Sequence, residues 1–176
     1  MRIAIVGCGQ LARMLALAGW EMGHHFTFLA DPDEGIRCVE GLGPVVYSDQ
    51  YPSGEALFEA LGRPDVVTVE KEHVSVALLE SLSAYCQVAP SADAIRVCQH
   101  RGREKTLLQS LDIATAPFHV VTDAVSLNKA VNTVGYPAFV KSCEQGYDGQ
   151  NQWLLKDADE LAALALQMST LPALIV

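Results

Sequence analysis

The first 90 residues alternate between short apolar runs and helix-like stretches, and this alternation limits the possible fold more than any other feature. The apolar runs predict buried strands at residues 2–6, 25–31, 43–49 and 65–70. The stretches after them predict helices at 11–23, 34–40, 53–63 and 75–86. Strands that alternate with helices usually pair in one parallel sheet with helices on both faces. We therefore expect a doubly wound α/β domain at the start of the chain.

A second unit begins after residue 92. Residues 92–111 predict one long helix with Gly102 as an interruption, followed by a loop and a strand at 112–121. Further helices are expected at 126–134 and 157–168, and further strands at 136–142, 151–156 and 172–176. We divide the chain into a first domain (1–92), a linking helix (93–113) and a small α/β subdomain (114–176). Because the last residues read as a strand, we expect the chain to be a fragment of a longer protein.

Composition excludes several classes of partner. The net charge is -9, and nucleic acids and anionic membranes both require a basic face, so we expect neither as a partner. Half of the residues are apolar, but the apolar runs are too short for a signal segment or a spanning helix. The five cysteines form no C-x-x-C pair, which favours reduced thiols and a cytoplasmic location.

The run GCGQLA, residues 7–12, follows the first predicted strand and precedes the first predicted helix. It fits the G-x-G-x-x-G/A pattern, in which glycines form a tight turn and the helix amides face a phosphate. Asp31 ends the second predicted strand, where an acid could bind a ribose hydroxyl. The run therefore fits an NAD-dependent oxidoreductase, and it fits equally a turn that serves only to pack helix against strand.

The run TVEKEHV, residues 68–74, follows the fourth predicted strand. Ligands of open α/β sheets bind beyond the carboxyl ends of the strands, so these carboxylates and this imidazole could hold a polar ligand. A solvated loop is the other interpretation.

Basic residues and glycines mark the second unit. Arg101 and Lys105 lie four apart on one face of the predicted helix, and this spacing alone favours a solvated face. Lys141 ends a predicted strand just before Gly146 and Gly149, where it could reach phosphate oxygens while backbone amides close over them. A hairpin with an exposed lysine is the alternative. The P-loop pattern is absent.

Taken together and in order, the runs GCGQLARM, TVEKEHV, HRGREKTLLQSLDIATAPF and GYPAFVKSCEQGYDGQNQ resemble the N5-carboxyaminoimidazole ribonucleotide synthase family of the ATP-grasp superfamily. The resemblance covers residues 1–155. It implies a Rossmann-like pre-ATP-grasp domain followed by the small α/β subdomain of an ATP-grasp fold, truncated before the large subdomain.

The resemblance also implies an activity, that of a ligase of purine biosynthesis. ATP phosphorylates bicarbonate to carboxyphosphate, and the amine of aminoimidazole ribonucleotide captures the resulting CO2. Mg²⁺ is the implied metal, and a homodimer is the implied assembly of the full-length protein. Another ATP-grasp ligase, using formate or an amino acid, and the NAD-dependent oxidoreductase stay as alternatives.

Site residues follow from the same resemblance, position by position. The implied ATP-binding residues are Arg101, Lys141, Gly146, Tyr147, Asp148, Gly149, Gln150, Asn151 and Gln152. The implied ribonucleotide-binding residues are Gly9, Gln10, Leu11, Glu70, Glu72, His73 and Val74. Catalytic residues and magnesium ligands are expected beyond Val176, so we expect no metal site in this chain and no activity from it alone.

This sequence departs from the family pattern at several positions. Cys8 and Ala12 stand where the family has glycines, and His100 stands where it has Asp. Gln145 replaces a frequent glycine, and Gln150 and Asn151 replace the usual basic residue and glycine of the phosphate flap. A neutral position 150 should weaken ATP binding by ~1 kcal/mol. In the full-length enzyme, Gln150→Lys should therefore lower the KM for ATP.

Overall fold

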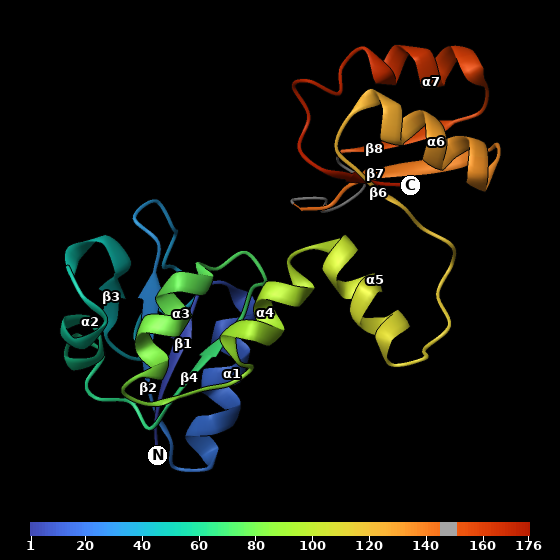
Figure 1. Ribbon diagram of the computed structural model, residues 1–176. Helices are drawn as coiled ribbons and strands as arrows, with labels where there is room; N and C mark the ends of the chain where they lie inside the picture. The colour runs from blue at the N-terminus through green and yellow to red at the C-terminus, as the bar shows by residue number, and fades with distance from the viewer. Residues whose placement is uncertain (145–150) are drawn as a thin grey trace. The chain divides into compact units, whose positions relative to one another are not determined.

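The computed structural model describes residues 1–144 and 151–176, which form two units, Met1–Arg96 and Val97–Val176 (Figure 1). Each unit has its own sheet and its own apolar core. The implied flap residues Gly146, Tyr147, Asp148, Gly149 and Gln150, together with Gln145, lie outside the described residues.

The first unit contains a five-stranded sheet in the order β3-β2-β1-β4-β5, in which every neighbouring pair is parallel. Its strands are β1 (Arg2–Val6), β2 (His25–Ala30), β3 (Val45–Tyr47), β4 (Val66–Val69) and β5 (Gln87–Val88). The first four confirm the predicted strands, and β5 was not predicted because two residues carry no periodicity. The central place of β1 is that of a doubly wound sheet, as expected.

Helices cover both faces of this sheet, and alternation along β1 decides which residues meet them. Ala4 and Val6 pack in a core with the helices α2 (Gly54–Ala60), α3 (Val76–Ser83) and α4 (Ala92–Cys98). Ile5 points to the other face and packs in a core with α1 (Gln10–Glu21). Because a strand has a period of two, one short apolar run supplies both cores. A short 3-10 helix, η1 (Ser48–Gln50), follows β3.

The helix predicted over residues 34–40 is wrong. Successive turns occupy this segment, with i to i+3 bonds such as Val39 N–H to the Ile36 oxygen at 3.0 Å. The Glu34 carboxylate accepts from the amides of Cys8 and Asp31, so its side chain holds the segment against the glycine turn. A contact across 26 residues has no local signal in the sequence.

The second unit contains a four-stranded antiparallel sheet in the order β6-β9-β7-β8. Its strands are β6 (Val120–Val121), β7 (Ala138–Ser142), β8 (Gln152–Leu155) and β9 (Leu174–Ile175). The helices α6 (Ala124–Val134) and α7 (Ala158–Ala165) share a core with Ala138 and Val140 of β7. Figure 1 shows both helices on the same side of this sheet. Phe139 and Lys141 alternate with those core residues and therefore lie on the opposite face.

The single helix predicted over residues 92–111 is also wrong, because it divides into α4 and α5 (Arg101–Ser110). His100 adopts extended φ and ψ angles and caps α5, its Nδ1 accepting from the amide of Arg103 at 3.2 Å. The break therefore lies before Gly102, which is buried inside α5. A Cβ at Gly102 would lie 2.6 Å from Cγ2 of Val120, so this glycine lets α5 approach β6 closely.

No helix among the residues that the structure describes is both long and apolar enough to cross a membrane. All five cysteines lie within the described ranges, and none is joined to another by a disulfide.

Candidate functional site

The glycine turn after β1 encloses a carboxylate of the protein itself. Gly7 has a φ of 112°, which favours glycine, and a Cβ there would lie 2.4 Å from Cγ of Glu70. A Cβ at Gly9 would lie 2.8 Å from Oε1 of the same side chain. Gly7 is therefore favoured by its φ and by the close approach of Glu70, and a Cβ at Gly9 would require the Glu70 carboxylate to shift.

Glu70 fills the place that an external anion would take at the start of α1. Its two carboxylate oxygens accept from the amide of Gly9 at 2.8 Å and from that of Ala12 at 2.9 Å. Glu34 accepts from the amide of Cys8, the residue before Gly9, at 2.7 Å. A dinucleotide pyrophosphate would have to displace these carboxylates, so the geometry argues against the NAD interpretation of GCGQLA.

Asp31, the candidate ribose ligand of that interpretation, is an ion-pair partner of Lys71. Nζ of Lys71 lies 2.9 Å from Asp31 and 2.8 Å from Glu34. Burial disfavours the ionised Glu34, but hydrogen bonds from Lys71, Asp31 and Cys8 outweigh it and lower the pKa of Glu34. Burial likewise opposes the charge of Lys71, while its bonds to Glu34 and Asp31 raise its pKa above the ordinary value. The cluster therefore fixes the TVEKEHV segment to the turn as a charged network.

Cys8, which occupies a glycine position of the family pattern, is fully buried. Burial and then the neighbouring Glu34 and Glu70 charges raise the pKa of its thiol to about 12. The thiol stays protonated at neutral pH and packs as a small apolar side chain.

The remaining predicted ribonucleotide-binding residues divide into exposed and buried ones. Gln10, Leu11, Glu72 and His73 are exposed, and His73 Nε2 lies 3.7 Å from Oε1 of Glu72. Val74 is only 9% exposed and belongs to the core beside α3, so its side chain has a packing role. The structure thus brings Gly9 and Glu70 together and leaves the polar side chains of Gln10, Glu72 and His73 at the surface.

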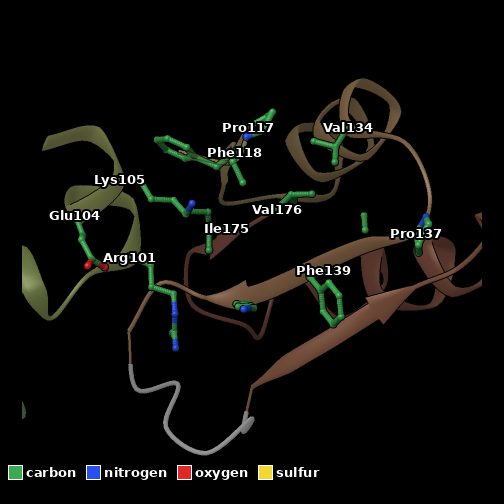
Figure 2. Close-up of a pocket in the computed structure, with 13 residues that line it drawn as sticks. Arg101, Glu104, Lys105, Pro117, Phe118, Val134, Pro137, Phe139, Ile175 and Val176 are labelled. Atoms are coloured by element: carbon green, nitrogen blue, oxygen red, sulfur yellow. The ribbon is translucent and has the colours of Figure 1, made fainter. Parts of the chain in front are cut away.

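The second unit holds a pocket of about 360 Å³ between α5, the segment before β6, and the open face of the sheet (Figure 2). The residues that line it are Arg101, Glu104, Lys105, Ala116, Pro117, Phe118, Val134, Pro137, Ala138, Phe139, Lys141, Ile175 and Val176. Arg101 and Lys141, both predicted to bind ATP, are in this wall. The wall therefore combines apolar side chains with cations, as a site for a nucleotide requires.

Arg101 is fixed to the end of β7 by its backbone and by its side chain. Its amide donates to the oxygen of Cys143 at 2.9 Å, and its Nη1 donates to the oxygen of Ser142 at 2.8 Å. These bonds dock the first turn of α5 onto the strand that carries Lys141. The spacing of Arg101 and Lys105 suggested a solvated helix face, and that interpretation is wrong, because both side chains are half-buried in the pocket wall.

Lys141 lies on the same open face as Phe139, with Nζ 5.8 Å from the centre of the Phe139 ring. Gln152 is its neighbour on β8, and Asn151 accepts from the amide of Ser142 at 2.9 Å. Lys141 and Ser142 at the end of β7 therefore lie beside Asn151 and Gln152 at the start of β8, and the glycine-rich segment lies between these two pairs in the sequence.

Two residues at the candidate sites, Glu34 and Lys105, were not predicted from the sequence. Glu34 holds the glycine turn from a distant segment and has no sequence signal. Lys105 does have a signal, its spacing of four from Arg101, but only the fold shows which way that helix face points. No cluster of three or more His, Cys, Asp or Glu side chains that could hold a metal occurs in ranges 1–144 and 151–176.

Comparisons with known proteins match the two parts of the chain to two different families. Residues 1–99 match the family described as the ribonucleotide synthetase preATP-grasp domain, and residues 106–176 match the ATP-grasp domain family. N5-carboxyaminoimidazole ribonucleotide synthase of Pseudomonas aeruginosa is 34% identical over 175 residues, which are 99% of this chain and 48% of that protein.

Solved structures give the same result. The Staphylococcus aureus N5-carboxyaminoimidazole synthetase complexed with ADP has a TM-score of 0.85 and 31% identity, covering 99% of this chain and 46% of its own. The Thermus thermophilus N5-carboxyaminoimidazole ribonucleotide synthetase has a TM-score of 0.83 and 32% identity, covering 98% and 46%. The chain spans about half the length of these relatives. With both its glycine turn and its cationic pocket in place, the chain belongs to the ribonucleotide synthetase preATP-grasp family and continues into an ATP-grasp domain.

Proposed function

We propose that the whole protein of which this chain is a part carboxylates 5-aminoimidazole ribonucleotide at the expense of ATP and bicarbonate. Bicarbonate attacks the γ-phosphorus of ATP, giving carboxyphosphate and ADP. Carboxyphosphate releases phosphate and CO2, and the exocyclic amine of the ribonucleotide captures the CO2 and loses a proton. The product is N5-carboxyaminoimidazole ribonucleotide.

The observation that carries this proposal is the convergence of Arg101 and Lys141 on one pocket with an apolar floor. Phosphoryl transfer depends mainly on positioning and on neutralising charge. Arg101 is held rigidly by Ser142 and Cys143, so its guanidinium can hold a phosphate oxygen in a fixed place relative to Lys141. The S. aureus relative, described as complexed with ADP, supports a nucleotide in the corresponding domain.

In the first unit, we propose that Gln10, Leu11, Glu72 and His73 face the ribonucleotide, since they are exposed beside the carboxyl ends of β1 and β4. The amides of Gly9 and Ala12 already bind Glu70. Glu70 would therefore shape this site as a fixed carboxylate, and Val74 would anchor the segment in the core.

Mg²⁺ is part of the proposal as the ion that neutralises the ATP phosphates. Its ligands are placed outside this chain, in the half of the relatives' length that the chain does not span, and no step above is assigned to it. We also propose a cytoplasmic homodimer that binds neither nucleic acid nor membrane, in keeping with the net charge of -9.

The test uses the complete product of the gene that encodes this chain. It is supplied with ATP, Mg²⁺, bicarbonate and aminoimidazole ribonucleotide, and ADP release is measured with each component omitted in turn. We expect release that needs all of them, and we expect none from the 176-residue chain alone. Turnover with formate in place of bicarbonate would favour another ATP-grasp ligase. Light scattering of the same preparation tests the dimer.

A further inference from the structure

Lys105 is a third cation in the wall of the pocket. It lies on α5 one turn after Arg101 and is half-buried, whereas Arg103 and Glu104 beside it are exposed. Its Nζ lies 5.4 Å from the centre of the Phe118 ring, within the range of a cation–π contact. Figure 2 shows the side chain reaching from α5 toward Phe118 and Ile175.

The backbone next to Phe118, whose ring Lys105 contacts, is held by hydrogen bonds. The next residue, His119, donates its amide to the oxygen of Val176 at 3.1 Å and accepts from the amide of Val176 at 3.0 Å. On the helix side, Gly102 allows α5 to lie against Val120. A lysine held between two such elements loses less conformational freedom on binding an anion than a lysine on an open surface does.

The charge of the pocket also points to an anion. The wall contains three cationic side chains, Arg101, Lys105 and Lys141, and one carboxylate, that of the exposed Glu104. The sequence has no Lys or Arg between Lys141 and Lys156, so the stretch that follows β7 contributes no cationic side chain. Any further cationic side chain for phosphates bound beside Lys141 therefore comes from other parts of the wall, and Lys105 is placed to supply one.

We propose that Lys105 binds the phosphate chain of the nucleotide, with Phe118 setting its direction. The inference rests on the proposed function, in that it assumes a nucleotide in this pocket. It goes further by assigning a binding role to a lysine that sequence spacing placed in solvent. Lysine suits the role because its flexible stem can extend along an aromatic ring and carry a compact charge to the phosphate.

The experiment measures binding of ADP and of adenosine to the complete gene product by calorimetry, and the KM for ATP by steady-state kinetics. We expect Lys105→Met to raise the Kd for ADP and the KM for ATP roughly fivefold to tenfold. Adenosine binding and kcat should change less than about twofold, because the lost contact is to phosphate in both ground and transition states. Lys105→Arg should restore most of the affinity. Lys129→Met, on the exposed side of α6, is the matched control and should change nothing.

Phe118 provides a second test through a double-mutant cycle. Phe118→Leu should raise the Kd for ADP in the wild-type background and have little effect once Lys105 is Met. Equal effects in both backgrounds would mean that Phe118 acts on the nucleotide directly, and would overturn its role in directing Lys105. Thermal melting of each variant separates a change in binding from a loss of fold.

The outcomes separate this inference from the proposed function. An active carboxylating enzyme whose Lys105→Met variant keeps its Kd for ADP overturns the inference and leaves the function standing. A protein that binds ADP through Lys105 but does not carboxylate the ribonucleotide supports the inference and overturns the function. A protein that binds no ADP overturns both.

Discussion

At the scale of single residues, Glu70 explains why the turn after β1 needs its glycines. The GCGQLA pattern is that of a phosphate turn, yet the anion that satisfies its amides comes from the end of β4. Sequence shows that an anion belongs at such a turn, because the helix amides need acceptors. It does not show whether that anion is a ligand or a side chain 61 residues away.

Removing the Glu70 carboxylate should destabilise the first unit. Glu70→Ala leaves the amides of Gly9 and Ala12 without their acceptors, and we expect a loss of about 2 kcal/mol in the free energy of unfolding. Glu70→Gln keeps one oxygen acceptor and should lose about half as much. Urea unfolding followed by circular dichroism measures both, with Glu40→Gln, at an exposed position, as control. Equal stability of Glu70→Ala and wild type would show that water replaces the carboxylate at no loss.

Glu34 should give the first unit a defined dependence on acid. Its pKa in the folded chain lies below its ordinary value of 4.5, mainly because the bonds from Lys71, Asp31 and Cys8 outweigh burial. A carboxyl group with a lowered pKa stabilises the fold above its ordinary pKa, and that stabilisation is lost as the pH falls through the lowered value. We therefore expect the unfolding free energy of wild type to fall more steeply below pH 4.5 than that of Glu34→Gln. If the unfolding free energies of wild type and Glu34→Gln fell equally with pH, Glu34 would not contribute to the loss of stability in acid.

At the scale of elements, two glycines of the same unit should respond differently to replacement by alanine. Gly43 precedes β3, and a Cβ there would lie 2.2 Å from the backbone oxygen of Phe26 in β2. Gly35 has no atom within 4 Å of its Cβ position, and neither glycine has a positive φ. Gly43→Ala should therefore lower the unfolding free energy by about 2 kcal/mol. Gly35→Ala should leave it unchanged or raise it by about 0.5 kcal/mol. Urea unfolding of the two variants measures both changes. A Gly43→Ala protein as stable as wild type would contradict the close approach of Gly43 to the backbone of Phe26.

The elements also show where sequence reasoning succeeds and fails. Strands β1 to β4 were predicted because each is an apolar run whose residues pack on two faces, as Ala4 and Ile5 do. The helix over 34–40 and the single helix over 92–111 failed for a shared reason. In each, a polar side chain, Glu34 or His100, binds backbone amides and ends or prevents a helix. Such contacts depend on geometry that periodicity does not contain.

The candidate site was also predicted only in part from the sequence, because its contacts depend on the fold. Arg101 and Lys141 were assigned from motifs, and the structure places both in one pocket wall. Lys105 was read as solvated because a spacing of four residues shows that two side chains share a helix face and does not show what that face meets. The role of Phe118 depends on the ladder between His119 and Val176, which joins segments far apart in the chain.

At the scale of the whole molecule, each unit carries one of the two tryptophans, Trp20 in the first and Trp153 in the second. Because each unit has its own core, we expect the units to unfold as separate cooperative transitions. During urea unfolding, the Trp153→Phe variant keeps only Trp20, so its fluorescence reports the first unit. The Trp20→Phe variant keeps only Trp153, so its fluorescence reports the second. The two midpoints should differ, and Gly43→Ala should shift only the Trp20 signal. Coincident midpoints that move together would show a single cooperative unit.

The closure of the glycine turn by Glu70 also orders events during synthesis. The ribosome releases the amides of Gly9 and Ala12 before it has made the carboxylate that accepts from them, because Glu70 lies 58 positions after Ala12. Until β4 has joined β1, the amides of Gly9 and Ala12 have only water as their acceptor, and joining these strands closes a long loop. The first helix of the chain therefore reaches the native hydrogen bonds of its N-terminal turn only after β4 has joined the centre of the first unit's sheet.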